Sequence, residues 1–511
     1  LYAQALVEED GVIRYVGQLE TALELAGPQA RKVDLEGRCL MPAFLDPHSH
    51  FMACANSLLQ VQLGECADQE EICQRLGDFV QREHLQPGEW VRGTGYDQND
   101  LAQGCPPDRW MLDRACPDHP VVIQHASGHV GVFNSRALEL LGVDENTPCP
   151  QGGVMEKDDQ GCLTGYMEEN AFLGLLQKVP MPDLKDLMDA LVRAQDRYAS
   201  YGIATVQEGM FMDAMLPLYQ AMLAQKLLKL DVVAYADPRD CKKIMEQFGD
   251  RIGHYKDHVK IGGDKIFLDG SPQGRTAWMR QPYEGEKDYR GYPVLTDKQV
   301  YGRLKSALER DVQILAHCNG DQAAEQYLSV MERLERETGR RLRRPVMIHA
   351  QLVGRDQLPR LKALGMIPSF FVAHVYHWGE VHVKNFGLER AEHISPAGTA
   401  CALGIPFTFH QDSPVIQPNM METVWCAVNR RTKTGRLLGE EERISTLEAL
   451  KAVTVYAAYQ YFEEDRKGSL AVGKAADFVI LGQDPLTADP MALRDIPVLE
   501  TIKDGRTIWP C

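Results

Sequence analysis

Short apolar segments recur along the chain and alternate with stretches of helical periodicity. Eight of these segments lie at residues 40–45, 203–207, 230–236, 265–268, 312–316, 345–348, 367–372 and 406–409. Most are followed by a helix-like stretch, such as residues 322–337 or 355–364. This alternation is typical of a parallel sheet wrapped by helices. The pattern therefore predicts an α/β fold built on a (β/α)8 TIM barrel.

The predicted barrel is interrupted after its first strand. About 150 residues separate the first strand from the second, far more than the dozen or so of a simple crossover. This spacing predicts an inserted subdomain at residues 60–190, lying over the barrel mouth. The barrel itself is expected to occupy residues 41–454.

Both ends of the chain have the alternation of β hairpins. Residues 5–17 hold an Asp10-Gly11 turn between two alternating runs, and residues 477–481 and 498–509 form similar runs around Asp504-Gly505. We expect residues 1–40 and 455–511 to pair into one β-sandwich beside the barrel.

Composition narrows the range of partners. The 511 residues are 44% hydrophobic and 25% charged, with a net charge of −17, which disfavours nucleic acid and anionic membranes. No apolar run approaches the ~18 residues of a membrane span. The 13 scattered cysteines lack CxxC pairs and indicate reduced thiols in a cytoplasmic protein. We expect a small-molecule substrate; a homo-oligomer remains open.

The most distinctive local pattern follows the first apolar segment, at Asp46-Pro47-His48-Ser49-His50. Two imidazoles two residues apart on an extended segment point to the same face. Neutral imidazole is a common metal ligand, so this pair can hold one metal ion at the mouth of a barrel. Taken alone, the pair also fits two histidines that cap a strand at the surface.

Further candidate ligands stand where other predicted strands end. The fifth, sixth and eighth strands end at His317, His349 and Asp412, on the face where barrel enzymes place their chemistry. The fourth strand begins at Lys265, and a buried lysine loses its proton readily. A neutral amine can add CO2 to form a carbamate, whose oxygens can bridge two cations. A salt bridge or a side chain reaching solvent is the alternative for Lys265.

Nine motifs run in order along nearly the whole chain. They are FLDPHSH from Phe44, GYDQND from Gly95, HASGHVGVFNSRAL from His125, GGVMEKDDQGCLTGYMEENA from Gly152, KIFLDGSPQGRTA from Lys265, HCNGDQA from His317, IHAQLV from Ile348, HQDSPV from His410, and GSLAVGKAADFVIL from Gly468. With these motifs the chain resembles the amidohydrolase superfamily, specifically its amidohydrolase-3 (YtcJ-like) branch, which includes N-substituted formamide deformylases.

The resemblance implies a metal-dependent hydrolase that cleaves a non-peptide C–N bond (amide, N-acyl or N-formyl) through a metal-activated hydroxide. It implies one or two divalent ions, with zinc expected, and a carboxylated Lys265 as the bridging ligand. The ligands carried over are His48, His50, Lys265, His317, His349 and Asp412. Asp412 is the implied catalytic residue, taking a proton from water and passing it to the leaving nitrogen.

Two positions depart from the usual pattern of this branch. In the motif that holds Asp412, a small residue or serine commonly precedes the aspartate, whereas this chain has His410-Gln411-Asp412; Cys318 stands where a small residue is frequent. His410 can contact substrate or support a metal ligand, and Cys318 fits a buried thiol that fills space. Asp97 and Asn99 also fit a plain turn. The candidate substrate-binding residues are Asp97, His125, Asp269, Arg275, His374, His377 and His410.

Other functions remain open on this scaffold. They are a deaminase, a lactone or imide hydrolase, an isomerase, and a catalytically silent interaction protein. Fold alone does not separate them, because function resides in the site.

Overall fold

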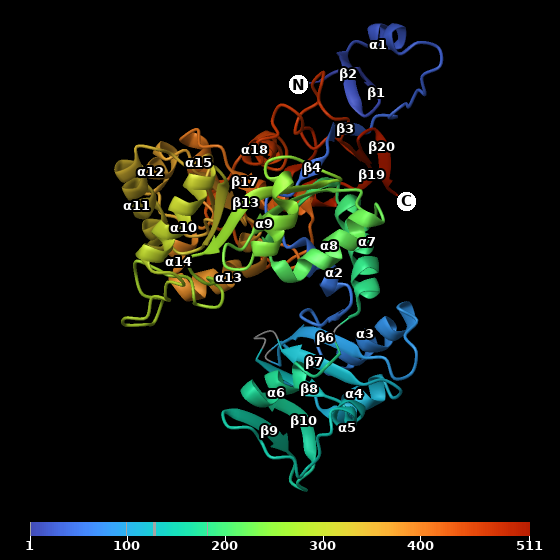
Figure 1. Ribbon diagram of the computed structural model, residues 1–511, viewed down its shortest axis with the longest axis vertical. Helices are drawn as coiled ribbons and strands as arrows, with labels where there is room; N and C mark the ends of the chain where they lie inside the picture. The colour runs from blue at the N-terminus through green and yellow to red at the C-terminus, as the bar shows by residue number, and fades with distance from the viewer. Residues whose placement is uncertain (1, 99, 126–128, 181, 511) are drawn as a thin grey trace. The chain divides into compact units, whose positions relative to one another are not determined.

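The predicted strands form one curled, eight-stranded parallel sheet, seen in a computed structural model that describes residues 2–98, 100–125, 129–180 and 182–510 (Figure 1). The strand order is β17-β16-β15-β14-β13-β12-β11-β4. The strands are β4 (Phe44–Leu45), β11 (Ile203–Phe211), β12 (Asp231–Ala236), β13 (Val259–Phe267), β14 (Gln313–Cys318), β15 (Val346–His349), β16 (Ile367–Phe370) and β17 (Thr408–Phe409). The carboxyl ends of all eight strands therefore share one edge.

The first predicted strand is wrong in one respect, because residues 40–45 serve two sheets. Strand β3 (Cys39–Pro42) pairs antiparallel with β18 (Phe478–Leu481), whereas β4 pairs parallel with β11. The chain changes sheets at Ala43, whose N–H donates to Asp477 O at 3.0 Å. Strand β3 is half-buried and β4 is fully buried, so one apolar run meets two environments.

Helices lie around the outside of this sheet (Figure 1). They include α8 (Leu216–Ala224), α9 (Lys242–Phe248), α10 (Asp297–Arg310), α11 (Asp321–Thr338), α12 (Leu358–Ala363), α13 (His374–Phe386), α14 (Leu388–Ala391), α15 (Ala397–Ala402), α16 (Met420–Asn429), α17 (Thr446–Ala452) and α18 (Val455–Gln460). Helix α10 shows why they form. Thr296 and Gln299 make a capping box at its start, and its buried Val300, Leu304 and Leu308 recur every four residues on one face.

Both chain ends contribute to antiparallel sheets. Strands β1 (Ala5–Glu9) and β2 (Val12–Gly17) pair with each other, as predicted around the Asp10-Gly11 turn. Strands β18, β19 (Val498–Lys503) and β20 (Arg506–Trp509) form a second sheet with β3. Ile13, Ala476 and Phe478 share one buried apolar cluster, so residues from both ends pack together.

The chain divides into two compact units, and Cys54–Leu191 is one of them. It holds a six-stranded sheet of order β5-β6-β7-β8-β10-β9. Its strands are β5 (Val61–Gln62), β6 (Val91–Tyr96), β7 (Val121–His125), β8 (Val130–Phe133), β9 (Gly153–Lys157) and β10 (Leu163–Glu168). Its main helices are α3 (Gln69–Arg82), α4 (Arg109–Ala115), α5 (Ser135–Leu140) and α6 (Glu169–Leu176). The placement of this insertion over the barrel mouth stays a prediction.

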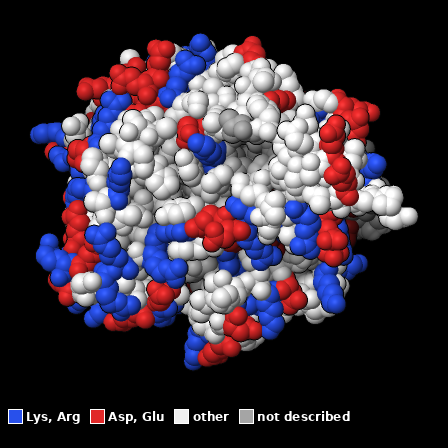
Figure 2. Space-filling view, turned by 90° about the horizontal axis from the view of Figure 1, so that it is seen from above, with Lys and Arg blue, Asp and Glu red and all other residues white. Residues whose placement is uncertain are grey.

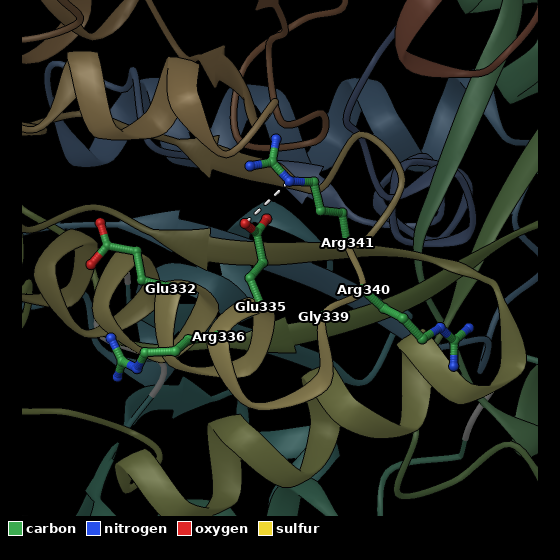
Figure 3. A pocket seen from close by; sticks show the side chains of 6 residues that line it. All are labelled: Glu332, Glu335, Arg336, Gly339, Arg340 and Arg341. Atoms are coloured by element: carbon green, nitrogen blue, oxygen red, sulfur yellow. Dashed lines mark ion pairs between the residues drawn. The ribbon is translucent and has the colours of Figure 1, made fainter.

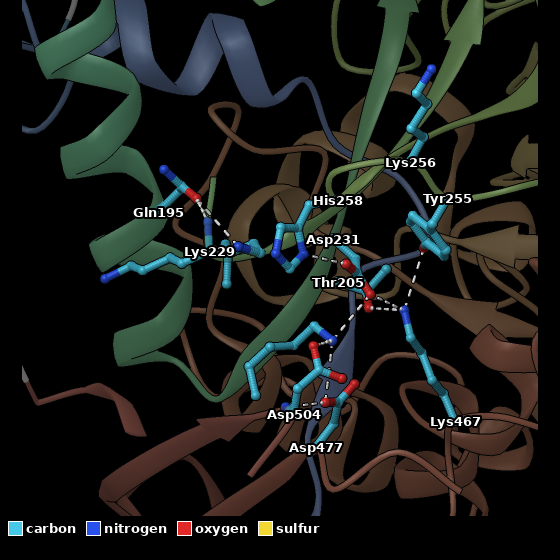
Figure 4. Close-up of polar contacts among 12 residues, drawn as sticks. Gln195, Thr205, Lys229, Asp231, Tyr255, Lys256, His258, Lys467, Asp477 and Asp504 are labelled. Carbon is cyan, nitrogen blue, oxygen red and sulfur yellow. Dashed lines mark hydrogen bonds and ion pairs between the residues drawn. The ribbon is translucent and has the colours of Figure 1, made fainter. Parts of the chain in front are cut away.

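A buried group of charges, here called the lysine–carboxylate cluster, lies where strands β12 and β13 begin (Figure 4). Its members are Lys260, Lys467, Lys503, Asp231, Glu463 and Asp477. Lys467 Nζ lies 2.6 Å from Asp231 and 2.8 Å from Glu463. Lys503 Nζ lies 3.1 Å from the same Asp231, and Lys260 pairs with Glu463. The cluster ties the parallel sheet to the C-terminal segment of the chain.

Acidic and basic side chains are intermixed on the face seen in Figure 2. None of the helices in the described part of the chain is long and apolar enough to cross a membrane.

Candidate metal centre

His48 and His50 lie directly after β4, as the sequence predicts, and approach a single carboxylate. His48 Nε2 is 3.3 Å from Asp412 Oδ1, and His50 Nε2 is 3.5 Å from the same oxygen. One ligand atom from each of the three residues lies within 4.8 Å of the others. The chain passes close to itself here, because a Cβ on Gly209 would lie 2.7 Å from Ser49 O. The two histidines do not merely cap an exposed strand.

The fourth strand does not begin at Lys265, where the sequence predicts its start: β13 begins at Val259, and Lys265 lies near its end, almost completely buried. Its Nζ is 3.1 Å from His48 Nε2. Burial lowers the pKa of Lys265 to about 7, although Asp412 acts in the opposite direction. A substantial share of this amine is therefore neutral near pH 7, which is the form that reacts with CO2.

The two remaining predicted ligands complete the group. His317, on β14, and His349, at the end of β15, approach through Nδ1 and Nε2 at 3.1 Å. His349 Nε2 also lies 3.9 Å from Asp412 Oδ2. We call the six residues the histidine cluster: His48, His50, Lys265, His317, His349 and Asp412.

Three of the histidines have their other ring nitrogen bound by the protein. Gln207 Oε1 lies 2.6 Å from His48 Nδ1, and Gly270 O lies 3.2 Å from His317 Nε2. His349 Nδ1 lies 3.0 Å from a fourth histidine, His410. Such contacts fix the ring orientation and decide which nitrogen presents its lone pair.

No role for Gln207 was predicted from the sequence, although the position of this amide in a buried strand could have indicated one. It lies on β11, which is buried at every position except one, and a buried amide needs partners. Its Nε2 donates to Pro47 O at 2.6 Å, so its Oε1 is free to accept from His48 Nδ1–H. The lone pair of His48 Nε2 then faces Asp412 Oδ1.

That arrangement fits a cation. Two acceptor atoms 3.3 Å apart, His48 Nε2 and Asp412 Oδ1, repel each other unless a cation or proton lies between them. Among the described residues, Asp412 Oδ1 is buried and has no hydrogen-bond donor. Imidazole nitrogens with a carboxylate oxygen are a donor set suited to zinc and similar divalent ions. The residues present therefore fit the metal that the motifs imply.

Burial keeps the histidines of the cluster neutral. It lowers the pKa of His50 to about 3, although Asp412 raises it, and the pKa of His317 to about 4, with Lys265 adding to the effect. The pKa values of His48 and His349 are lowered well below the usual range, again mainly by burial. Neutral imidazole is the form that binds metal.

Strained backbone angles occur at two of the predicted ligands and at a residue next to one of them. His349 has φ 71°, Ala350 has φ 45° and Asp412 has φ 54°, a region that non-glycine residues enter at a cost. Two of the three are predicted ligands. Strain of this kind persists only where surrounding contacts hold it, and it is frequent at functional sites.

Two predicted substrate-binding residues pair with each other in the second unit. His125 Nε2 lies 3.5 Å from Asp97 Oδ1. Asn99 lies outside the described residues. A role of this pair at the metal centre stays a prediction.

Asp269 and Arg275 follow β13 and have different partners. Asp269 is buried and accepts backbone N–H bonds from Trp278, Asn319 and Gly320 at 2.9, 2.9 and 2.7 Å. It thereby holds the loop that carries Asn319, which contacts His317 at 3.0 Å. Arg275 Nη2 pairs with Glu286 at 3.0 Å and is about a third exposed. Arg275 is the more accessible of the two.

The histidines after β16 lie on helix α13. His374 is buried, and its Nδ1 lies 3.0 Å from His382 Nε2. His377 Nε2 is 3.0 Å from Glu422 Oε1 and is partly exposed. Phe371 packs 4.4 Å from the ring of His374 and 5.4 Å from the ring of His410, so it lies between α13 and the histidine cluster.

A separate hollow lies at the end of helix α11 (Figure 3). Acidic and basic side chains line it together, and Arg341 Nε pairs with Glu335 at 3.3 Å. Its lining contains none of the predicted site residues. The lining residues are Glu332, Glu335, Arg336, Gly339, Arg340 and Arg341.

Fold and donor set together define a class: α/β proteins with a parallel sheet whose strands carry, at their carboxyl ends, side chains suited to divalent metal. Within that class the chain belongs to the amidohydrolase family, whose family model (Amidohydro_3) matches residues 31–509. The resemblance read from the motifs is thus confirmed.

Relatives agree over almost the full chain. YtcJ of Bacillus subtilis (strain 168) is 27% identical over 521 residues, covering 99% of this chain and 96% of YtcJ. N-substituted formamide deformylase of Arthrobacter pascens is 27% identical over 520 residues, covering 98% and 94%. A solved structure, described as an uncharacterized metal-dependent hydrolase from Pyrococcus horikoshii OT3, is 28% identical with a TM-score of 0.76, covering 95% and 94%. These findings support a metal-dependent hydrolase.

Proposed function

We propose that this protein hydrolyses a non-peptide C–N bond, in an amide, N-acyl or N-formyl compound, at the histidine cluster. The observation that carries the proposal is that the ends of five different strands bring together four histidines, one lysine and one carboxylate, the six predicted ligands. A structural role would not require four neutral histidines around one carboxylate.

One divalent ion would be held by His48, His50, Asp412 and Lys265, and a second by Lys265, His317 and His349. Bound there, such ions polarise a carbonyl and lower the pKa of water. We propose zinc as the metal and a carboxylated Lys265 as the group shared between the two positions. The neutral amine of Lys265, 3.1 Å from His48 Nε2, supports the carboxylation.

Asp412 moves the proton. Its Oδ1 is buried and faces the two ring nitrogens of His48 and His50. We propose that this carboxylate accepts a proton from the attacking water and delivers it to the leaving nitrogen. Proton transfer by a positioned carboxylate contributes roughly 10²- to 10⁴-fold to rate.

The proposal also includes the fold around the site. We propose that the eight-stranded sheet closes into a barrel and that the terminal sheets pack as a sandwich. A hydrogen bond of 2.9 Å from His50 N to Ser413 O, between the segments after β4 and β17, supports closure. The buried Ile13, Ala476 and Phe478 support the sandwich.

The substrate class is supported by one relative. The Arthrobacter pascens protein, 27% identical over 98% of this chain, is an N-substituted formamide deformylase. An N-formyl or N-acyl amine is accordingly the first class to test.

The test is a hydrolysis screen on protein reconstituted with zinc. The panel contains N-formyl amines, N-acyl amines, N-acyl amino acids, cyclic imides and lactones. Released amine is measured for the first three groups, and the carboxylic acid formed by ring opening is measured for the imides and lactones. We expect turnover of a member of the first three groups, and its loss in Asp412→Asn. Turnover confined to lactones or imides would overturn the substrate class. A zinc-loaded protein that hydrolyses none of the panel would overturn the proposed function.

A further inference from the structure

His410 lies two residues before Asp412 and packs against the histidine cluster. It follows β17 directly and is fully buried. Its ring centroid is 5.1 Å from the ring of His48 and 5.1 Å from the ring of His349. One imidazole therefore fills the space between two proposed ligand rings.

His410 is bonded at both ring nitrogens. Its Nε2 lies 3.0 Å from His349 Nδ1, and its Nδ1 lies 2.9 Å from Ser369 Oγ. Ser369 lies on β16 and is also fully buried. The three side chains form a line of two hydrogen bonds that ends at a proposed ligand.

When His349 binds metal, the two hydrogen bonds of this line can have only one donor-to-acceptor direction. The ligand nitrogen, His349 Nε2, must present a lone pair, so His349 Nδ1 carries the proton and donates it to His410 Nε2. Because His410 Nε2 then accepts a hydrogen bond, its own proton lies on Nδ1 and is donated to Ser369 Oγ. The reverse direction would place a proton on His349 Nε2, where it would block the metal.

The ring of His410 packs among other rings. Phe371 packs 5.4 Å from its ring, and its other ring neighbours are the imidazoles of His48 and His349. An uncharged imidazole therefore stands here in place of the carboxylate or carbonyl that more often orients a metal-binding histidine.

We propose that His410, anchored by Ser369, is a positioning residue that holds His349 in its metal-binding orientation and tautomer. This inference rests on the proposed metal function of the cluster. It assigns to the buried ring of His410 a definite task, which needs a hydrogen-bond acceptor at this position.

Two substitutions at position 410 separate hydrogen bonding from bulk. His410→Leu removes the acceptor, whereas His410→Gln places Oε1 close to the position of the ring Nε2 and keeps one. The measurement is the Co²⁺ and Zn²⁺ affinity of the full chain, by chelator competition, with the visible Co²⁺ spectrum and the thermal midpoint recorded for each variant. The matched control is His382→Gln, since His382 is another buried histidine bonded at 3.0 Å to a ring nitrogen.

We expect His410→Leu to weaken affinity about 10- to 100-fold, the range for residues that support a ligand. We expect His410→Gln to restore most of it, Ser369→Ala to fall between the two, and the control to match wild type. Unchanged affinity in His410→Leu, or equal weakening in the Leu and Gln variants, would overturn the positioning role alone. A wild-type protein that binds neither ion would overturn the proposed function as well.

Discussion

Strand β13 carries two buried lysines five residues apart, and their surroundings differ in kind. Lys260, near the start of the strand, pairs with Glu463 and donates to Tyr461 O at 3.0 Å. Lys265, near the end, contacts the neutral ring of His48. One strand thus links the lysine–carboxylate cluster to the histidine cluster. Comparing the two clusters shows how buried polarity serves structure in one place and chemistry in the other.

Charge is balanced in the first cluster. Burial alone would raise the pKa of Asp231, yet Lys467 and Lys503 hold it well below its usual range, so the carboxylate is ionised and paired. The histidine cluster has one carboxylate, a lysine that is only partly protonated and neutral rings. A buried charge persists when it is paired or when it binds metal. The histidine cluster is therefore suited to the metal that we propose, whereas the lysine–carboxylate cluster is paired within the chain.

The two clusters also lie at opposite ends of the strands. Asp231 is the first residue of β12, whereas His349 is the last residue of β15. In barrel enzymes the carboxyl ends carry catalysis and the amino ends carry stability. Variants in the two clusters should therefore have opposite effects on activity and folding.

The largest effect on activity is expected from Lys265→Ala. Loss of a shared ligand removes several kcal/mol of transition-state stabilisation, which corresponds to at least about 100-fold in rate. Metal content should fall with activity, and short-chain carboxylates should restore part of both. Metal analysis and turnover with and without propionate provide the measurement. Full metal content in the variant would rule out the carbamate bridge.

The corresponding change in the balanced cluster is Lys467→Met. It leaves Asp231 and Glu463 buried with fewer partners, and breaking a buried pair costs about 3–5 kcal/mol. Urea unfolding should show this loss, while turnover per folded molecule stays near wild type. The control is Arg333→Ala, which breaks an exposed pair with Glu337 and should cost less than about 1 kcal/mol. Equal stability of the two variants would contradict the assignment of this cluster to folding.

A smaller effect is expected where the protein orients a ligand without being one. Gln207→Leu frees His48 Nδ1 and should weaken metal affinity about 10- to 100-fold. The control is Gln326→Leu, since Gln326 is a buried glutamine that donates to Leu295 O at 2.9 Å outside both clusters. Metal titration of both variants measures the difference. Equal affinities would show that the contact with Gln207 does not hold His48.

The sequence made one cluster predictable and left the other unseen. His48 and His50 are two residues apart, and His317, His349 and Asp412 each end an apolar segment, so local pattern and strand periodicity suffice. The ion pair of Lys467 with Asp231 joins residues 236 positions apart, and nothing local marks either partner. The division of residues 40–45 between two sheets escaped prediction for the same reason, since the partner of β3 lies near the other end of the chain.

The dependence of stability on pH should also distinguish buried rings from paired charges. Burial lowers the pKa of His382 to about 3, whereas an unfolded histidine titrates near 6.5. The unfolded chain therefore binds a proton that the folded protein excludes, and stability falls as the pH drops below about 6.5. The depressed pKa of Asp231 has its effect only below about pH 4, where unfolded aspartates protonate.

Between pH 7 and pH 5, wild type should thus lose about 1–2 kcal/mol more stability than His382→Phe. The ring of His382 stacks on Phe386 at 5.9 Å, so phenylalanine keeps the packing and removes the titrating group. Urea unfolding of metal-free protein at the two pH values measures the difference. The same loss in both proteins would show that His382 does not titrate in this window. A smaller loss in the variant would show that the buried ring of His382 lowers stability between pH 7 and pH 5. The ion pairs around Asp231 should not contribute in this range.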